Sequence, residues 1–296
     1  MGSSKEPVLK TLLYSDIFDY PLKKSEIWRF LISGKKENKQ EIYKILNAKN
    51  SFFGVKDNFY YLKGKENTVE KRKEKEKIST GKIKFARKTL EKFKFIPTVY
   101  FIGISGSLAM KNSDKDDDID LFVITARNSV WVTRLIMVII LRVMGIYRKR
   151  EDKNVSNKIC LNMLIDETAI TFPKTRQDLY TAHEIAQLAP VLNKNSFHEK
   201  FINGNFWVSK FLPNAFSQKK TFIPVSSPSF PERLLKSLLS LNLIENFARN
   251  IQFNYMKNHK TTETVRDDFL AFHPLDYKVT VLRKYRNKTV NDSYSN

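Results

Sequence analysis

Two aspartates spaced one residue apart stand at the head of an apolar run, where Asp118 and Asp120 precede Leu121–Ile124. Alternate residues of a β-strand point to the same face, so the two carboxylates should project together while Ile119 turns into a core. Two carboxylates on one face repel each other unless a cation lies between them. A hard divalent cation with oxygen ligands, such as Mg²⁺, suits that place best. The pair therefore predicts a magnesium site.

A glycine-serine pair precedes this strand. Gly106-Ser107 follows the apolar run Tyr100–Ile104, and ten residues separate Ser107 from Asp118. A turn of this kind that opens a helix offers backbone N–H groups and a hydroxyl to an anion, as phosphate-binding turns do. A phosphate cradle beside a metal site predicts the binding of a nucleoside triphosphate.

Other chemical motifs are excluded by their spacing. The chain has no Gly-x-x-x-x-Gly-Lys-Ser/Thr loop and no Gly-x-Gly-x-x-Gly fingerprint. An EF-hand loop that began at Asp114 would need glycine and glutamate where the sequence has Ile119 and Thr125. His183-Glu184 lacks the second histidine of a zinc-protease motif.

The composition is that of a folded, strongly basic protein. Hydrophobic residues make up 42% of the 296 residues, which excludes global disorder. Lysine and arginine number 52 against 31 acidic residues, a net charge of +21. Such an excess favours an acidic partner, RNA or DNA first, with a lysine-rich surface typical of the host as the alternative. The one cysteine, Cys160, excludes an intramolecular disulfide, and we expect a buried, inert thiol.

No segment of the sequence predicts membrane association. No apolar stretch follows a basic start, so a secretory signal peptide is not expected. The most apolar window, Val130–Ile146, contains Arg134 and Arg142 and falls short of a membrane span. We therefore expect a cytoplasmic protein.

Residues 1–64 should form a compact helical unit that ends in a β-hairpin. Apolar spacing and β-forming residues place its elements at Leu9–Phe18, Ser25–Ser33, Glu41–Leu46, Phe52–Val55 and Phe59–Leu62. Three helices followed by a hairpin are typical of a winged helix, which binds duplexes through its third helix. A protein-binding or structural module is the alternative.

The rest of the chain divides into a linker, a core and a C-terminal region. Residues 65–95 should form a charged linker helix, residues 96–170 an α/β core, and residues 171–296 a mainly helical region. In the core we expect strands at Val99–Ile104, Asp118–Thr125 and Ile159–Ile165, and helices at Gly106–Met110 and Ser129–Met144. Further along we expect helices at Ala182–Leu188, Phe201–Phe211 and Leu234–Tyr255, a connector at Pro213–Pro231, and a frayed tail beyond Arg286.

The paired motifs resemble the signature of the DNA polymerase β-like nucleotidyltransferase superfamily. That signature is an apolar residue with Gly-Ser, a gap, and Asp-x-Asp in an apolar strand, matched here by Ser105-Gly106-Ser107 and Asp118-Ile119-Asp120-Leu121. The resemblance covers residues 96–170. More loosely, through Leu12–Pro21 and Tyr180–Glu184, the chain is similar to bacterial and archaeal proteins in which a nucleotidyltransferase domain follows a winged helix.

The resemblance implies an α+β fold, with a mixed-sheet, palm-like core between an N-terminal winged-helix unit and C-terminal helices. It implies that Asp118 and Asp120 are catalytic and hold two Mg²⁺ ions. It also implies that Gly106 and Ser107 bind the β- and γ-phosphates of a nucleoside triphosphate such as ATP. Nucleotidyl transfer is an in-line displacement, in which two cations activate the attacking hydroxyl and neutralise the leaving pyrophosphate.

The superfamily usually adds a third carboxylate from a neighbouring strand, and here the chain departs from the pattern. The middle inward position of Ile159–Ile165 should be Asn162, which is neutral and would contact the nucleotide instead. Asp166 has the same parity but lies about 13 Å further along an extended strand. Either Asp166 reaches the site past a bend as a catalytic residue, or the site has only two acids.

Basic residues near the motifs could contact phosphates, Lys111 foremost, or could be solvated surface residues. The others are Lys115, Arg127 and Lys158.

These observations favour a Mg²⁺-dependent nucleotidyltransferase that adds a nucleoside monophosphate to a hydroxyl acceptor. A nucleic-acid end is the favoured acceptor, and a small molecule or a protein side chain is possible. The rival is a regulatory protein that binds nucleotide and nucleic acid but has lost the chemistry. Asn162 favours the rival, whereas the intact Gly106-Ser107 and Asp118-x-Asp120 favour the enzyme.

Overall fold

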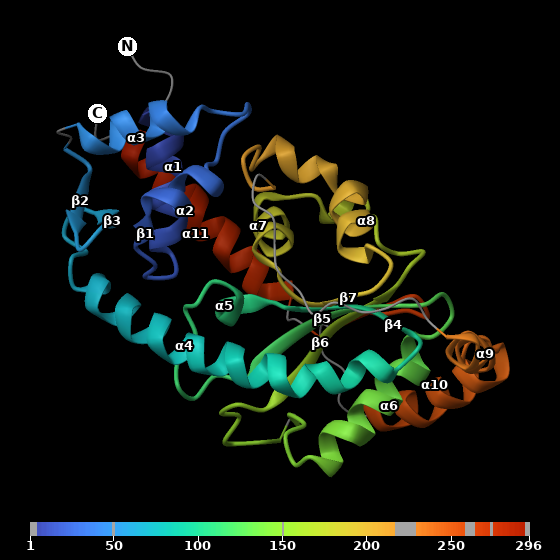
Figure 1. Ribbon diagram of the computed structural model, residues 1–296. Coiled ribbons are helices and arrows are strands. Elements are labelled where there is room, and N and C mark those ends of the chain that lie inside the picture. Colours follow the sequence, from blue (N-terminus) through green and yellow to red (C-terminus); the bar gives the residue numbers. More distant parts are fainter. Residues whose placement is uncertain are drawn as a thin grey trace.

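The computed structural model describes residues 5–48, 51–149, 151–216, 229–257, 264–272 and 275–293 (Figure 1). It is a mixed α+β protein built around an open six-stranded sheet with helices on both faces, which confirms the predicted α+β class. Among the helices in these ranges, none has the length and apolarity needed to cross a membrane.

The central sheet has mixed strand directions. Strands β5 and β6 run parallel, and every other neighbouring pair is antiparallel. The spatial order is β7 (Ala189–Asn193), β4 (Val99–Ile104), β5 (Ile119–Thr125), β6 (Ile159–Asp166), β9 (Phe269–Ala271) and β8 (Thr264–Val265). The short helix α5 (Gly106–Ala109) lies between β4 and β5 in the chain. The three central strands match the sequence prediction, whereas the three outer strands were not predicted because they are short.

Helices cover the two faces of the sheet with separate hydrophobic cores. One face carries α4 (Thr68–Leu90), α6 (Val130–Val143) and α10 (Asn242–Lys257), and the other carries α7 (Leu179–Gln187) and α8 (Phe197–Gly204) (Figure 1). Leu90 and Trp131 are fully buried on the first face, and Ala182 and Phe201 on the second. Burial of both faces explains why the central strands are continuous apolar runs.

The N-terminal unit has its own small sheet and core. Its elements are α1 (Lys5–Asp16), β1 (Leu22–Lys23), α2 (Lys24–Arg29), α3 (Lys39–Asn47), β2 (Phe53–Lys56) and β3 (Phe59–Leu62). The strands pair in the antiparallel order β1-β3-β2. Asp57 and Asn58 join β2 to β3 with φ of 52° and 65°, as a type I′ hairpin turn requires. The predicted helices and hairpin are confirmed, and β1 adds a third strand.

A buried arginine of α4 ties the N-terminal unit to the central sheet. Arg72 Nη1 donates to Lys111 O (2.8 Å) and Nη2 donates to Tyr20 Oη (2.7 Å) and Glu26 Oε1 (3.2 Å). Tyr20 Oη in turn donates to Met110 O (2.6 Å). Because Met110 and Lys111 follow α5, this network holds the loop after α5 against the N-terminal unit.

The C-terminal region is more segmented than the sequence predicts. The apolar stripe over Leu234–Tyr255 is divided between α9 (Phe230–Leu239) and α10, which begins two residues after Ser240. The prediction of a frayed tail beyond Arg286 is wrong as far as Ser293, because α11 (Leu275–Ser293) continues and Lys288 Nζ lies 2.5 Å from Asp16 Oδ2 of α1. Of the predicted connector at Pro213–Pro231, residues 217–228 lie outside the described residues.

Candidate functional site

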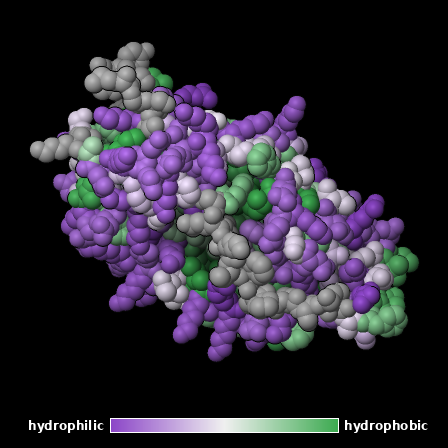
Figure 2. All heavy atoms as spheres, turned by 45° about the horizontal axis from the view of Figure 1, so that its top comes forward, coloured by the Kyte–Doolittle hydropathy of each residue, from purple (hydrophilic) through white to green (hydrophobic). Residues whose placement is uncertain are grey.

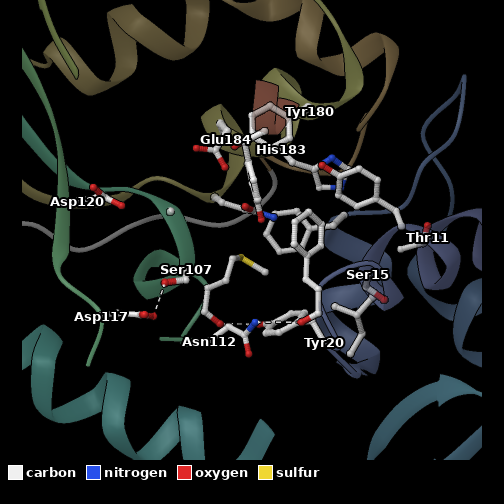
Figure 3. Close-up of a pocket in the computed structure, with 18 of the residues that line it drawn as sticks. Thr11, Ser15, Tyr20, Ser107, Asn112, Asp117, Asp120, Tyr180, His183 and Glu184 are labelled. Carbon is white, nitrogen blue, oxygen red and sulfur yellow. Dashed lines mark hydrogen bonds between the residues drawn. The ribbon is translucent and has the colours of Figure 1, made fainter. Parts of the chain in front are cut away.

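Strand β5 brings two carboxylates to one cavity. Asp118 immediately precedes β5 and Asp120 lies within it, whereas Ile119 and Leu121 are fully buried in the core. Both aspartates line a cavity of about 340 Å³. Its walls also include α1 and α7, and Figure 3 shows Asp120 facing residues of these two helices. The period of the strand explains why these two side chains share a face.

The Gly106–Ser107 turn lies against the same strand. Gly106 has φ of +63°, a left-handed conformation that favours glycine. A Cβ at this position would lie 3.1 Å from Asp120 Oδ2, so the close approach of turn and carboxylate also needs glycine. Ser105 N donates to Asp120 O (2.9 Å), which fixes the turn to β5. Gly106 and Ser107 both line the cavity.

The third acid of the loop has a structural role. Asp117 Oδ2 accepts hydrogen bonds from Asp114 N (2.8 Å), Ser113 Oγ (3.3 Å) and Ser107 Oγ (3.4 Å) (Figure 3). Asp117 therefore closes the loop before β5 and orients the Ser107 hydroxyl.

An arginine lies against the aspartate pair. Arg148 Nε is 2.8 Å from Asp118 Oδ2, and Arg148 Nη1 is 3.6 Å from Cys160 Sγ. Burial raises the pKa of both Asp118 and Asp120, and the charge of Asp120 raises the pKa of Asp118 further. The guanidinium opposes this rise because it favours ionised carboxylates.

Cys160 is not the core thiol that the sequence predicts. It pairs with Asp120 across β5 and β6, is only partly buried, and lies beside both aspartates. Burial and the two carboxylates raise the pKa of the Cys160 thiol, so it keeps its proton at neutral pH.

The donor set fits a hard divalent cation. One oxygen of each aspartate and Cys160 Sγ lie within 4.8 Å of one another. Asp118 Oδ2 is buried and, within the described part of the chain, accepts no hydrogen bond, although it forms the ion pair with Arg148. Carboxylate oxygens are ligands for Mg²⁺, whereas a protonated thiol is not. Asp118 and Asp120 are thus the residues that could hold the ion.

The structure does not bring Asn162 to the cavity. The ladder between β5 and β6 shifts register, with Asp120 opposite Cys160 but Phe122 opposite Met163. This bulge adds a residue to β6 and changes which side chains share a face. Cys160 therefore takes the position beside Asp120, and the buried Asn162 accepts through its carbonyl from Phe272 N (2.9 Å).

Asp166 lies at the far end of the same strand. It pairs with Thr125, about 20 Å along β6 from Cys160. Its carboxylate accepts hydrogen bonds from Asn128 N (3.1 Å) and Thr168 N (2.8 Å). The prediction that Asp166 reaches the site past a bend is therefore wrong in this structure, because backbone donors hold it at the opposite end of β6.

Lys111 contributes its backbone rather than its side chain. It has φ of 56°, is exposed, and accepts through its carbonyl the hydrogen bond from Arg72. Its side chain does not line the cavity that holds the aspartates.

Besides Asp117, Asp118 and Asp120, a fourth carboxylate, Glu184, reaches the cavity from α7 (Figure 3). Burial and then the charge of Asp120 raise the pKa of Glu184 to about 7. Glu184 was not predicted as an acid of the site, because it lies on a helix and the superfamily pattern takes its third carboxylate from a neighbouring strand. The only signal was its place in the Tyr180–Glu184 segment, which entered the whole-chain resemblance without a role.

Aromatic packing between α7 and α1 forms the wall opposite the sheet. His183 stacks on Tyr14 with ring centroids 4.0 Å apart, and His183 Nδ1 donates to Leu179 O (2.9 Å). The N-terminal unit thus contributes directly to the cavity, through Tyr14 and Ser15 of α1.

Comparison of the chain with protein-family models, curated proteins and solved structures finds no match in any of the three. The candidate site is therefore defined by its own geometry.

Proposed function

We propose that this protein is a Mg²⁺-dependent nucleotidyltransferase, which moves a nucleoside monophosphate from a triphosphate to a hydroxyl acceptor and releases pyrophosphate. The observation that carries the proposal is the convergence of Asp118, Asp120 and the Gly106–Ser107 turn on one cavity. A cavity of about 340 Å³ has the size of a small-molecule site.

Each group has a role in this reaction. Asp118 and Asp120 would hold Mg²⁺, which when bound supplies charge that acidifies an attacking hydroxyl and neutralises a leaving pyrophosphate. Gly106 lets the turn lie directly against the Asp120 carboxylate, so a phosphate bound at the turn would be next to a metal ion held by the aspartates. The Ser107 hydroxyl, whose proton points to Asp117 Oδ2 at 3.4 Å, would turn from Asp117 to donate to a phosphate oxygen.

The transfer step needs an acceptor for one proton. The acceptor oxygen bonds to the α-phosphorus while the bond from that phosphorus to the bridging oxygen breaks, and pyrophosphate leaves with the electron pair. Glu184 lines the same cavity as the aspartates and would take the proton of the hydroxyl.

The topology supports the finer description of the fold. Strand β5 is antiparallel to β4 and parallel to β6, and it presents Asp118 and Asp120 at one end of the sheet. A palm-like nucleotidyltransferase core would have this arrangement. Three helices with the sheet β1-β3-β2 support a winged helix. Both assignments belong to the proposal, as does a cytoplasmic location.

Label transfer tests the proposal. The protein is incubated with Mg²⁺, each α-³²P-labelled triphosphate and, in separate arms, total RNA, the protein alone or a small-molecule extract. Transfer should be lost in Asp118→Ala, in Asp120→Ala and after chelation with EDTA. The matched control is Asp116→Asn, an exposed acid of the same loop that does not line the cavity. Transfer that survives both alanine variants would refute the proposal.

A second candidate is a nucleotide-binding regulatory protein without catalysis. The ion pair between Arg148 and Asp118 favours it, because the guanidinium neutralises an oxygen that a metal ion would use. Tight triphosphate binding without label transfer in any arm would support this candidate.

Nucleic acid is the partner that the charge suggests. Figure 2 shows hydrophilic side chains over much of one face, and exposed lysines of α4 include Lys71, Lys77, Lys84 and Lys88. Binding through such a surface should weaken steeply as salt rises. Gel shifts with duplex and single-stranded probes over a salt series test it, and an affinity that ignores salt would count against it.

A further inference from the structure

A second cavity adjoins the one that holds the aspartates. It has a volume of about 300 Å³ and shares three wall residues with the first, Tyr180, Glu184 and Tyr277. Tyr180 and Glu184 lie one turn apart on α7, and the rings of Tyr180 and Tyr277 are 6.1 Å apart. Glu184 is therefore the one carboxylate among the described lining residues that faces both spaces.

Most of the second cavity is aromatic or aliphatic. Its lining includes Phe122, Phe172, Phe201, Ile185 and Leu188. Phe122 and Phe201 come from the sheet and from α8, and their rings are 4.9 Å apart. Such a lining suits a flat, apolar group.

One cationic side chain of this cavity lacks a counter-ion within the described residues. Arg176 Nη2 donates to Thr264 Oγ1 (3.0 Å), and its guanidinium lies over the Phe269 ring, 4.4 Å from the centroid. Arg266 lies over the same ring but is paired through two nitrogens with Asp268. Lys278, the other cation of the lining, is paired with Asp178.

A half-buried guanidinium that no carboxylate of the described residues pairs can gain free energy by binding an anion. Its planar array of donors matches a phosphate or a carboxylate. The polar end of the second cavity therefore has the chemistry of an anion site, and the rest has that of an apolar site.

Building on the proposed transferase activity, we propose that the second cavity binds the acceptor. The acceptor would be a small molecule with a hydroxyl group, a flat apolar body and an anionic group that pairs with Arg176. With the apolar body among the phenylalanines, the hydroxyl lies toward Glu184 and the first cavity. The hydroxyl oxygen then bonds to the α-phosphorus, pyrophosphate leaves with the electrons of the broken bond, and Glu184 takes the proton.

This assignment narrows the acceptor from the nucleic acid favoured by net charge to a small molecule. A space of about 300 Å³ holds a drug-sized ligand, whereas a duplex would need an open groove. A polynucleotide end that enters the cavity is the contrary outcome of the test below.

Isothermal titration with simple probes tests the site. The probes are phenyl phosphate and benzoate, with neutral benzyl alcohol for comparison, in the presence and absence of ATP and Mg²⁺. We expect one or both anions to bind at least tenfold more tightly than benzyl alcohol, and ATP not to displace them. The anion that binds more tightly identifies phosphate or carboxylate as the group recognised.

Three variants connect binding to this cavity. Arg176→Gln should weaken the anionic probe at least tenfold and leave the ATP affinity within twofold. Thr175→Trp, an exposed position at the cavity, should block the probe by bulk without removing charge. Lys174→Gln, an exposed neighbour outside the lining, removes the same charge and should change neither affinity.

Several results would overturn the assignment. They are equal probe binding by the wild type and Arg176→Gln, displacement of the probe by ATP, no binding of either anion, and displacement of the probe by a single-stranded oligonucleotide. Label transfer and ATP binding report on the proposed transferase, whereas Arg176-dependent probe binding reports on the second cavity. Failure of one is therefore seen separately from failure of the other.

Discussion

Carboxylates at the two ends of the central sheet differ in the hydrogen bonds that they accept. Glu245 of α10 accepts from Trp131 N (2.8 Å) and Val132 N (2.9 Å) at the start of α6, and Asp166 accepts from two backbone N–H groups at the nearby end of β6. At the other end, Asp118 Oδ2 is buried without a hydrogen bond from the described residues.

The difference separates acids that stabilise the fold from the acids that we propose bind a metal ion. Backbone donors satisfy the first group, and Glu245 accepts from two N–H groups in the first turn of α6. The oxygens of the second group lie beside a cavity, next to Arg148 and to each other, at an electrostatic cost that the fold must offset. Substitutions should therefore affect stability at one end and activity at the other.

The largest effect is expected at Asp118 and Asp120. Their replacement by asparagine should reduce label transfer at least about 1,000-fold, because the metal contributes several kcal/mol to the transition state. The melting temperature without metal should stay equal or rise in Asp120→Asn, since this change removes a buried charge beside Asp118, and should change little in Asp118→Asn, which also loses the ion pair with Arg148. Label transfer and calorimetry measure the two effects. A large fall in melting temperature would mean that these acids are structural.

The next effect is a pH dependence of stability from His183. Burial lowers the pKa of His183 to about 4, below its ordinary 6.5, so the unfolded chain binds the proton more readily. The stabilisation is complete above pH 6.5 and is lost as pH falls toward 4, by about 3 kcal/mol in all. Urea unfolding of the wild type and His183→Phe at pH 7, 5.5 and 4.5 measures this. The two stabilities should converge in acid, and parallel pH profiles would contradict the prediction.

We expect Glu184, like Asp118 and Asp120, to affect activity rather than stability. Glu184→Gln should lower the rate of label transfer about 100-fold, the range for loss of a general base, with ATP affinity and melting temperature nearly unchanged. Glu167→Gln, an acid at the far end of the sheet, is the control. Equal rates for wild type and Glu184→Gln would exclude Glu184 as the proton acceptor.

The smallest effect is expected at the structural end. Glu245→Ala should lower the free energy of unfolding by about 2 kcal/mol, because two backbone donors at the start of α6 lose their acceptor. Transfer per folded molecule should change less than twofold. Urea unfolding and label transfer measure these quantities. If Glu245→Ala were as stable as the wild type, Glu245 would not stabilise the fold, and the proposed difference between the two ends of the sheet would be wrong.

Much of the fold, and part of the candidate site, can be predicted from the sequence. The apolar runs predict β4, β5 and β6, and the alternation of β5 places Asp118 and Asp120 on one face, because the period of a strand is a local property. Asn162 and Asp166 could not be placed in the same way. The bulge between β5 and β6 depends on how two strands pair, and one inserted residue changes the faces that follow.

The place of Glu184 in the cavity could not be predicted from the sequence either. Its approach to Asp120 depends on how α7 packs over the sheet, and no local spacing connects a helix residue with a strand so distant in sequence. The three outer strands β7, β9 and β8 could not be predicted from the sequence either, because they form only by pairing with the other strands of the sheet.

Helix α11 contacts two distant parts of the molecule. Tyr277 near its start borders both cavities, and Lys288 near its end holds Asp16 of α1, whose neighbours Tyr14 and Ser15 form another wall. Segments close to the two ends of the chain thus enclose the same chamber. A fragment trimmed to residues 96–170 would keep the twin acids yet lose the enclosure.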